Sequence, residues 1–187
     1  MGFGEGISCD IRLNTALTQQ QRELYQNTKA IRNILSECRT VAMVGLSSDR
    51  YKASYFVASY LRAYGYRVIP VNPGADTILG EKAWPDLASV PEKVDLVDVF
   101  RPASECPPIT EEAIKIGARA IWFQLRIINL EAADRALRAG LYVVVDRCVK
   151  MEHGRFSGGL HDGGFNTELI SAKRAVFSGL RDHGRGG

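Results

Sequence analysis

Five short apolar segments alternate with segments of helical periodicity, and this alternation strongly constrains the fold of the chain. The apolar segments, which lie between residues 41 and 146, are VAMVG, YRVIPVNP, VDLVDVF, ARAIWFQ and LYVVVD. Between them, SYFVASYLRAYG, PPITEEAIKIG and NLEAADRALRAG place apolar residues at helical spacing. Strands that alternate with helices indicate a parallel sheet covered on both faces. We therefore expect an α/β fold with a doubly wound sheet of about five strands, most simply in the order 3-2-1-4-5.

The segments at the two ends of the chain differ from this central pattern. From Thr18 to Cys38 the apolar residues fall near helical spacing, which predicts one amphipathic helix with Thr18 as its N-cap. The connection ILGEKAWPDLASVP is predicted to contain at most a short helical turn. After Cys148 the glycine-rich stretch GRFSGGLHDGGFN precedes a predicted short helix, TELISAKRAVF. We divide the chain into an N-terminal helical extension (1–39), a central domain (40–153) and a C-terminal helical tail packed on that domain (154–187).

Composition narrows the class of protein. The chain has 187 residues, 45% of them apolar and 24% charged, which suits one globular domain. The net charge of +3 comes from scattered Lys and Arg, so we expect no nucleic-acid partner. No apolar run reaches the roughly 20 residues that span a bilayer, and no signal peptide is visible, so we expect a cytoplasmic protein without a membrane partner. The four dispersed cysteines indicate thiols rather than disulfides.

Ligands bind to sheets of this type beyond the carboxyl ends of the strands. Polar or irregular residues follow each predicted strand here: Gly45, Leu46, Ser47 and Ser48; Asn72 and Pro73; Phe100 and Arg101; Gln124; and Asp146, Arg147 and Cys148. Every strand must end in some loop, so ordinary polar loop ends remain an alternative. The aromatic residues Phe100 and Trp122 favour a binding edge.

The loop after the first strand has the features of a phosphate site. A helix N-terminus offers unpaired N–H groups and a positive dipole end. Ser47, Ser48 and Ser54 add hydroxyl groups, and Arg50 and Lys52 add positive charge. A solvated loop with a serine cap remains the alternative.

A dinucleotide of the NAD type fits this loop poorly. Such sites use three glycines and an acidic residue at the end of the second strand. This chain has only Gly45, with Ser47 and Arg50 in place of the later glycines, and its second strand ends in Asn72 and Pro73. The phosphate-binding sequence G-K-[ST] is absent as well.

Several short motifs in order resemble the bacterial CoA-binding proteins. They are VAMVGLSS, YRVIPVNPG, ILGEKAWPDLASVPEKVDLVDVFRP, AIWFQL and VVVDRCVKMEH, from about Thr40 to His153. That family is similar to the N-terminal CoA-binding domain of the succinyl-CoA synthetase α subunit. The resemblance implies a Rossmann-like fold that binds coenzyme A or an acyl-CoA.

The resemblance also implies roles for individual residues. The loop from Gly45 to Ser54 would hold the CoA phosphates. Asn72 and Pro73 would flank the nucleotide, and the far wall of the site would consist of Val99, Phe100 and Arg101. Val71 and Gln124 are further candidate binding residues. The ribose of CoA carries a 3′-phosphate, which Arg50, Lys52 or Arg101 could pair with. The sequence departs from the family pattern at Arg126, where glycine is usual; Arg126 would either narrow the cleft or contact a phosphate.

Catalysis and metal binding are not favoured. Cys148 and His153 lie five positions apart, but a nucleophilic thiol needs a base in contact with it and a group that orients that base. A milder hypothesis places Cys148 near the CoA thiol, where oxidation would join the two in a mixed disulfide. The three histidines and four cysteines match no zinc spacing.

Three functions remain. The first is a CoA-binding sensor or carrier without catalysis. The second is a subunit of a CoA-dependent ligase whose chemistry a partner chain supplies; the phosphohistidine of the synthetase is carried by another domain, so this chain alone is not expected to form acyl-CoA. The third is an NAD(H)-binding regulator. The additional helices make a homo-oligomer possible.

Overall fold

The computed structural model describes residues 17–157 and contains a five-stranded parallel sheet with helices on both faces. The sheet strands are β1 (Thr40–Val44), β2 (Arg67–Val71), β5 (Leu96–Val99), β6 (Ala120–Phe123) and β7 (Tyr142–Val144). A separate hairpin is formed by β3 (Thr77–Ile78) and β4 (Glu81–Lys82). The helices are α1 (Gln19–Tyr25), α2 (Thr28–Glu37), α3 (Ala53–Ala63), the 3-10 turn η1 (Ala103–Glu105), α4 (Cys106–Lys115), α5 (Leu130–Arg138) and α6 (Val149–Ser157). The predicted Rossmann-like α/β fold is confirmed.

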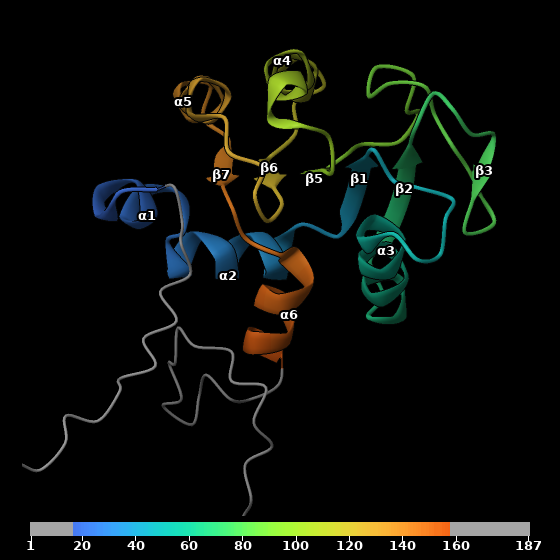
Figure 1. Ribbon diagram of the computed structural model, residues 1–187, viewed down its shortest axis with the longest axis horizontal. Coiled ribbons are helices and arrows are strands. Elements are labelled where there is room, and N and C mark those ends of the chain that lie inside the picture. Colours follow the sequence, from blue (N-terminus) through green and yellow to red (C-terminus); the bar gives the residue numbers. More distant parts are fainter. Residues whose placement is uncertain (1–16, 158–187) are drawn as a thin grey trace, which may run out of the picture.

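Two helical layers enclose the sheet. In Figure 1, α4 and α5 lie on one face, while α2, α3 and α6 lie on the other. Alternate residues along each strand enter two apolar clusters: Ala42 and Val97 pack on the α4 and α5 side, and Met43 and Trp122 pack on the α3 and α6 side. Because both faces are buried, these strands are apolar along their whole length, which is why the sequence shows short continuous apolar runs.

The strand order differs from the one expected. The sheet runs β2-β1-β5-β6-β7, so the third strand in sequence pairs with β1 and not with the outer edge of β2. Pro70 in β2 explains this result. Its carbonyl accepts a hydrogen bond from the N–H of Trp84 (2.9 Å), so the N–H that proline lacks faces the outer edge. A strand with proline at that position is suited to the sheet edge.

The N-terminal segment forms two helices where one was expected. Thr18 is the N-cap of α1, as predicted, and with Gln21 it completes a capping box. The helix ends at Tyr25, and Asn27 caps α2 through a hydrogen bond from the N–H of Ala30. Gln26, between the two helices, donates to the carbonyl of Val145 beyond β7 (3.0 Å). The turn therefore lets the segment follow the edge of the sheet at β7.

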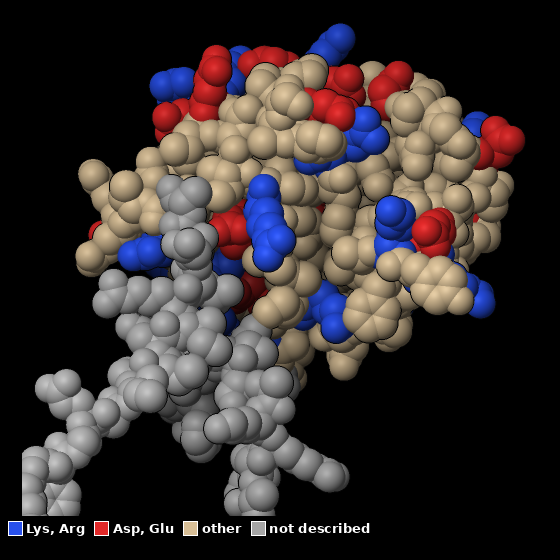
Figure 2. All heavy atoms as spheres, viewed as in Figure 1, with Lys and Arg blue, Asp and Glu red and all other residues tan. Residues whose placement is uncertain are grey.

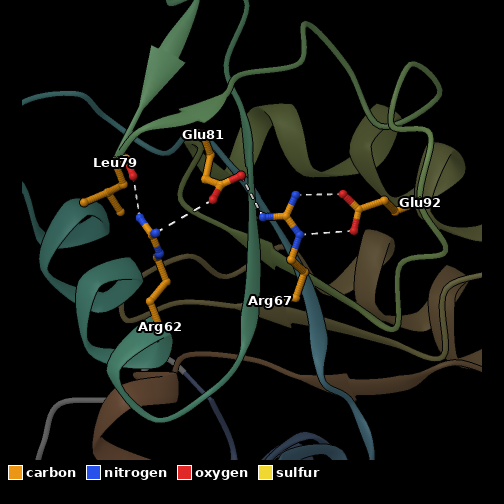
Figure 3. A network of polar contacts seen from close by, with 5 residues as sticks. All are labelled: Arg62, Arg67, Leu79, Glu81 and Glu92. Atoms are coloured by element: carbon orange, nitrogen blue, oxygen red, sulfur yellow. Dashed lines mark hydrogen bonds and ion pairs between the residues drawn. The ribbon is translucent and has the colours of Figure 1, made fainter.

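The connection after β2 contains a hairpin where a helical turn was expected. Arg67 of β2 pairs bidentately with Glu92 and also with Glu81 of β4, and Arg62 of α3 donates to the carbonyl of Leu79 (Figure 3). These contacts tie the hairpin to α3 and to the edge strand β2.

The chain continues after β7 into α6, a helix that the sequence pattern did not predict. The GRFSGGLHDGGFN stretch begins in α6 but extends, with the predicted helix TELISAKRAVF, beyond the described residues. Within residues 17–157, no helix is long and apolar enough to cross a membrane.

Candidate functional site

Gly45 makes the turn that opens the predicted phosphate loop. Its φ of +86° is a conformation that side chains disfavour, and its N–H donates to the carbonyl of Val71 (2.9 Å). A Cβ at this position would lie 2.7 Å from Cδ of Arg101 and 3.1 Å from the carbonyl oxygen of Phe100. The glycine therefore allows the chain after β5 to lie directly against the loop after β1.

Hydrogen bonds within the loop hold its shape. The N–H of Ser47 donates to Oγ of Ser54 (3.1 Å), and the N–H of Asp49 donates to Oγ of Ser47 (3.1 Å). The N–H of Tyr51 donates to Oδ1 of Asp49 (2.9 Å). Both serine oxygens act as acceptors in these bonds; Ser54 is buried, whereas Ser47 is only half-buried. The loop is thus built before any ligand binds.

The N-terminus of α3 faces this loop without a side-chain cap. Lys52 occupies the N-cap position and makes no capping hydrogen bond to the described chain, so the first N–H groups of the helix keep their capacity to bind an anion. Arg50 and Lys52 are exposed, and neither has a carboxylate partner among residues 17–157. Ser48 is exposed too, and Tyr51 is 91% exposed.

Asn72 connects the second strand to the same loop. Its Nδ2 donates to the carbonyl of Leu46 (2.8 Å), and its Oδ1 accepts from the N–H of Gly74 (2.8 Å). Leu46 is fully buried below the loop, while Pro73 is exposed beside it. At the position where an NAD site carries a ribose-binding carboxylate, this chain has the amide of Asn72, whose hydrogen bonds join neighbouring loop segments.

The end of β5 forms the third wall. Val99 is buried, and the N–H of Phe100 donates to the carbonyl of Val44 (2.8 Å), which joins the ends of β5 and β1. Phe100 is half-buried against the cluster under α3. Arg101 is exposed and pairs bidentately with Glu105 at 2.7 and 2.9 Å. An anion that binds Arg101 has to share its guanidinium with this carboxylate.

The residues predicted after β6 form a second group. Gln124 is buried, and its Nε2 donates to Oδ1 of Asp98 (2.7 Å). Arg126 is exposed with a φ of +65°, and its N–H donates to Oδ1 of Asp146 after β7 (2.7 Å). The first bond joins the end of β6 to β5, and the second joins the loops after β6 and β7. The structure thus brings together the predicted residues of 45–54, 71–73 and 99–101, and places Gln124 beside Val99. Arg126 lies next to the loop after β7 instead.

Asp98 is a polar residue at this edge that sequence reasoning did not identify. It is 0% exposed, and burial raises its pKa to about 7, although the hydrogen bond from Gln124 acts in the opposite direction. Its Oδ2 has no hydrogen-bond partner among the described residues. An aspartate inside the apolar segment VDLVDVF is the sequence signal that points to it, because burial of an ionisable side chain is costly.

Cys148 lies between β7 and α6, half-buried in the cluster that also contains Leu46 and Phe100. Burial raises the pKa of its thiol; the negative charge of Asp98 acts in the same direction, and the backbone amides of Met151 and Lys150 oppose it. His153, considered as a base for this thiol, instead contacts the hydroxyl of Tyr60 (3.0 Å). The Cys148–His153 arrangement of a nucleophilic enzyme is not formed.

Charges on the surface are mixed. In Figure 2, Lys and Arg alternate with Asp and Glu along the upper part of the visible face and do not gather in one basic patch there. Within residues 17–157, no group of three or more His, Cys, Asp or Glu side chains is arranged to hold a metal ion.

Comparison with known proteins identifies the family to which this fold belongs. Residues 39–154 match the family described as a CoA binding domain, and the chain belongs to this family. The resemblance read from the sequence motifs is thereby confirmed.

Individual relatives fall into two groups. The uncharacterized protein YneT of Bacillus subtilis is 35% identical over 123 residues, which cover 66% of this chain and 91% of that protein. The acetate–CoA ligase (ADP-forming) II of Archaeoglobus fulgidus is 30% identical over 83 residues, 43% of this chain but only 12% of the ligase. Among solved structures, a hypothetical protein from Pyrococcus horikoshii superposes with a TM-score of 0.68 at 38% identity, covering 70% of this chain and 92% of that one. This chain therefore matches most of the length of YneT and of the Pyrococcus horikoshii protein, and only a minor part of the ligase.

Proposed function

We propose that this protein binds coenzyme A or an acyl-CoA at the carboxyl edge of its sheet, as a sensor or carrier without catalysis of its own. The observation that carries the proposal is the uncapped N-terminus of α3 beneath a preformed loop that presents Ser47, Arg50 and Lys52. Membership of the CoA-binding domain family supports the identity of the ligand. A cytoplasmic location remains a prediction from the sequence.

The three walls of the edge suit different parts of CoA. The loop of residues 45–54 supplies N–H groups, hydroxyls and two cations for the phosphates. Phe100, which is only half-buried, supplies apolar surface for the adenine, while Val71 is buried in the core beneath the strand end. The residues directly after β2 include no carboxylate, so that strand end places no negative charge where it would repel the 3′-phosphate of the ribose. Arg50, Lys52 and Arg101 are the candidate partners of this phosphate.

Calorimetric titration with CoA, acetyl-CoA, dephospho-CoA and NAD(H) tests the proposal. We expect CoA to bind more tightly than dephospho-CoA by about 10- to 100-fold, because one charge-assisted contact contributes about 1.5–3 kcal/mol. Arg50→Ala should weaken CoA binding and reduce the preference for CoA over dephospho-CoA. Lys93→Ala is the charge-matched control, since Lys93 precedes β5 at the opposite edge of the sheet.

Failure of every CoA species to bind would contradict the proposal, and a preference for NAD(H) would favour the regulator alternative. Equal affinity for CoA and dephospho-CoA would remove the 3′-phosphate from the recognised groups.

A second candidate function is a part of a CoA-dependent ligase whose remaining parts lie on a partner chain. The observation that favours it is the similarity to a short segment of an ADP-forming acetate–CoA ligase. A neighbouring gene for the complementary ligase part would support it. The direct test is formation of ATP from ADP, phosphate and acetyl-CoA when that partner is added, with neither chain active alone.

A further inference from the structure

Cys148 is the most accessible of the described cysteines. Cys38 and Cys106 are 2% and 0% exposed, whereas Cys148 is half-buried at the N-terminus of α6. Its carbonyl accepts from the N–H of Glu152 (3.0 Å), and the backbone amides of Lys150 and Met151 act on its sulfur. It follows the carboxyl end of β7 in the parallel sheet, and it packs on the same face of the sheet as Leu46. Cys148 therefore lies at the same edge of the sheet as the proposed CoA site.

A second, independent feature lies beside this thiol. Oδ2 of Asp98 is buried without a hydrogen-bond donor from the described residues, while Oδ1 is satisfied by Gln124. Val97 and Val99 belong to the cluster under α4 and α5, so the side chain of Asp98 between them points to the opposite face of the sheet, on which Cys148 packs. A negative charge on Asp98 raises the pKa of the Cys148 thiol. A buried acceptor without a donor costs about 1–3 kcal/mol. A ligand that brings a donor to this point is therefore favoured, and the pantetheine arm of CoA carries amide N–H groups and a terminal thiol.

We propose that Cys148 exchanges with a disulfide of CoA, so that the protein carries CoA as a mixed disulfide on this residue. The inference rests on the proposed CoA site. In the exchange, the Cys148 thiol loses its proton and its sulfur attacks one sulfur of the CoA disulfide. The disulfide bond of the reagent breaks, a bond between Cys148 and CoA forms, and the departing CoA thiolate takes up a proton. The CoA disulfide is itself the oxidant, so no further redox partner is needed.

Selectivity for CoA follows from the position of the thiol. A half-buried thiol that is mainly protonated at neutral pH reacts slowly with small disulfides from solution. A disulfide whose nucleotide is bound on the loop of residues 45–54 is held near the thiol at a high effective concentration. We therefore expect CoA disulfide to react at least about tenfold faster than glutathione disulfide at equal concentration.

Mass spectrometry of the full chain tests the inference. The reduced protein is incubated with CoA disulfide or with glutathione disulfide, and adducts are quantified over time and located by peptide mapping. We expect one CoA adduct, on the peptide that contains Cys148, and slower formation when reduced CoA is present as a competitor. Cys148→Ser should lose the adduct, and Cys9→Ser, outside the described residues, should keep it.

The outcomes separate this inference from the proposed function. If titration shows CoA binding to the wild-type chain but no adduct forms on Cys148, the exchange is refuted and the CoA site stands. Equal rates with the two disulfides, or an adduct on Cys9 alone, also refute it. If CoA does not bind at all, both proposals fail. Peptide mapping on the wild-type chain keeps the test decisive even if Cys148→Ser folds poorly.

Discussion

At the scale of single residues, Gly45 decides whether the loops after β1 and β5 can meet. Gly45→Ala adds a Cβ 2.7 Å from Arg101 and imposes a φ of +86° on an alanine. We expect a loss of about 1–3 kcal/mol in the free energy of unfolding and weaker CoA binding, because Arg101 and the loop must separate. Urea unfolding and calorimetric titration measure the two effects.

Gly65→Ala is the matched control for this substitution. Gly65 has a similar φ of +82°, but a Cβ there would meet no atom of the described residues within 4 Å. It should therefore lose stability from backbone strain alone and keep its affinity for CoA. If both variants bind CoA equally well, the close approach of Arg101 to Gly45 has no part in binding.

Asp98 makes stability depend on pH. With its pKa raised from 3.8 to about 7, the folded chain holds a proton between these values that the unfolded chain has released. The contribution of Asp98 to stability therefore falls as pH rises through this range, by up to about 4 kcal/mol, and changes little above it. Asp98→Asn removes the ionisation, so we expect its melting temperature to exceed that of the wild type at pH 8. If the substitution recovers about 2 kcal/mol of the lost stability, the melting temperature rises by about 4–8 °C.

The difference between Asp98→Asn and the wild type should shrink at pH 5. Asp76→Asn, at an exposed position, is the control and should show no such change with pH. A melting temperature of Asp98→Asn that stays below the wild-type value at pH 8 would show that the carboxylate stabilises the fold.

At the scale of elements, Gln26 joins the turn between α1 and α2 to the edge of the sheet. Its side chain donates to the carbonyl of Val145 (3.0 Å) and accepts from Arg147 (2.8 Å) in a position only 9% exposed. Gln26→Ala leaves both partners without their bond, so we expect a loss of about 1–3 kcal/mol in urea unfolding. The exposed Gln20→Ala should change stability by less than about 0.5 kcal/mol. Equal effects would mean that the turn does not anchor the helices.

At the scale of the whole molecule, the two N-terminal helices belong to the same core as the sheet. Leu17 and Tyr25 enter the cluster under α4 and α5, and Ile31, Ile34 and Leu35 enter the opposite one. We expect a fragment of residues 40–157 to be less stable than residues 17–157 by more than about 3 kcal/mol, since each buried side chain contributes about 1.5–3 kcal/mol. Chemical unfolding of both fragments measures the difference. Equal stability would show that residue 40 begins an independent domain.

Most elements were predictable because their signals are local. The five sheet strands follow from short apolar runs. The helices α3, α4 and α5 follow from helical periodicity, and the cap at Thr18 follows from its hydroxyl acceptor. The break after Tyr25 was not predictable in this way because residues 18–38 keep an amphipathic pattern across it. The helix α6 was not predicted because it is short and its apolar residues form no clear stripe.

The location of the candidate residues at the carboxyl edge could be predicted from the sequence, because the carboxyl ends of parallel strands lie on one side of a sheet. Asp98 was not found, although an acid within an apolar strand is visible in the sequence. Its unpaired oxygen and its effect on Cys148 depend on β5, β6 and α6 meeting, which residues far apart in the chain bring about.

Local patterns in the chain were thus enough to define the five sheet strands, the helices α3, α4 and α5, and the loop that follows β1. Pro70 adds one piece of tertiary information to these patterns, because its missing N–H by itself favours an edge position for β2. Which strands are neighbours, and which side chains share a buried environment, came only from the folded molecule. The reason is physical: helix and strand periodicity depend on residues a few positions apart, whereas the β1–β5 pairing and the desolvation of Asp98 depend on packing between segments about 50 residues apart.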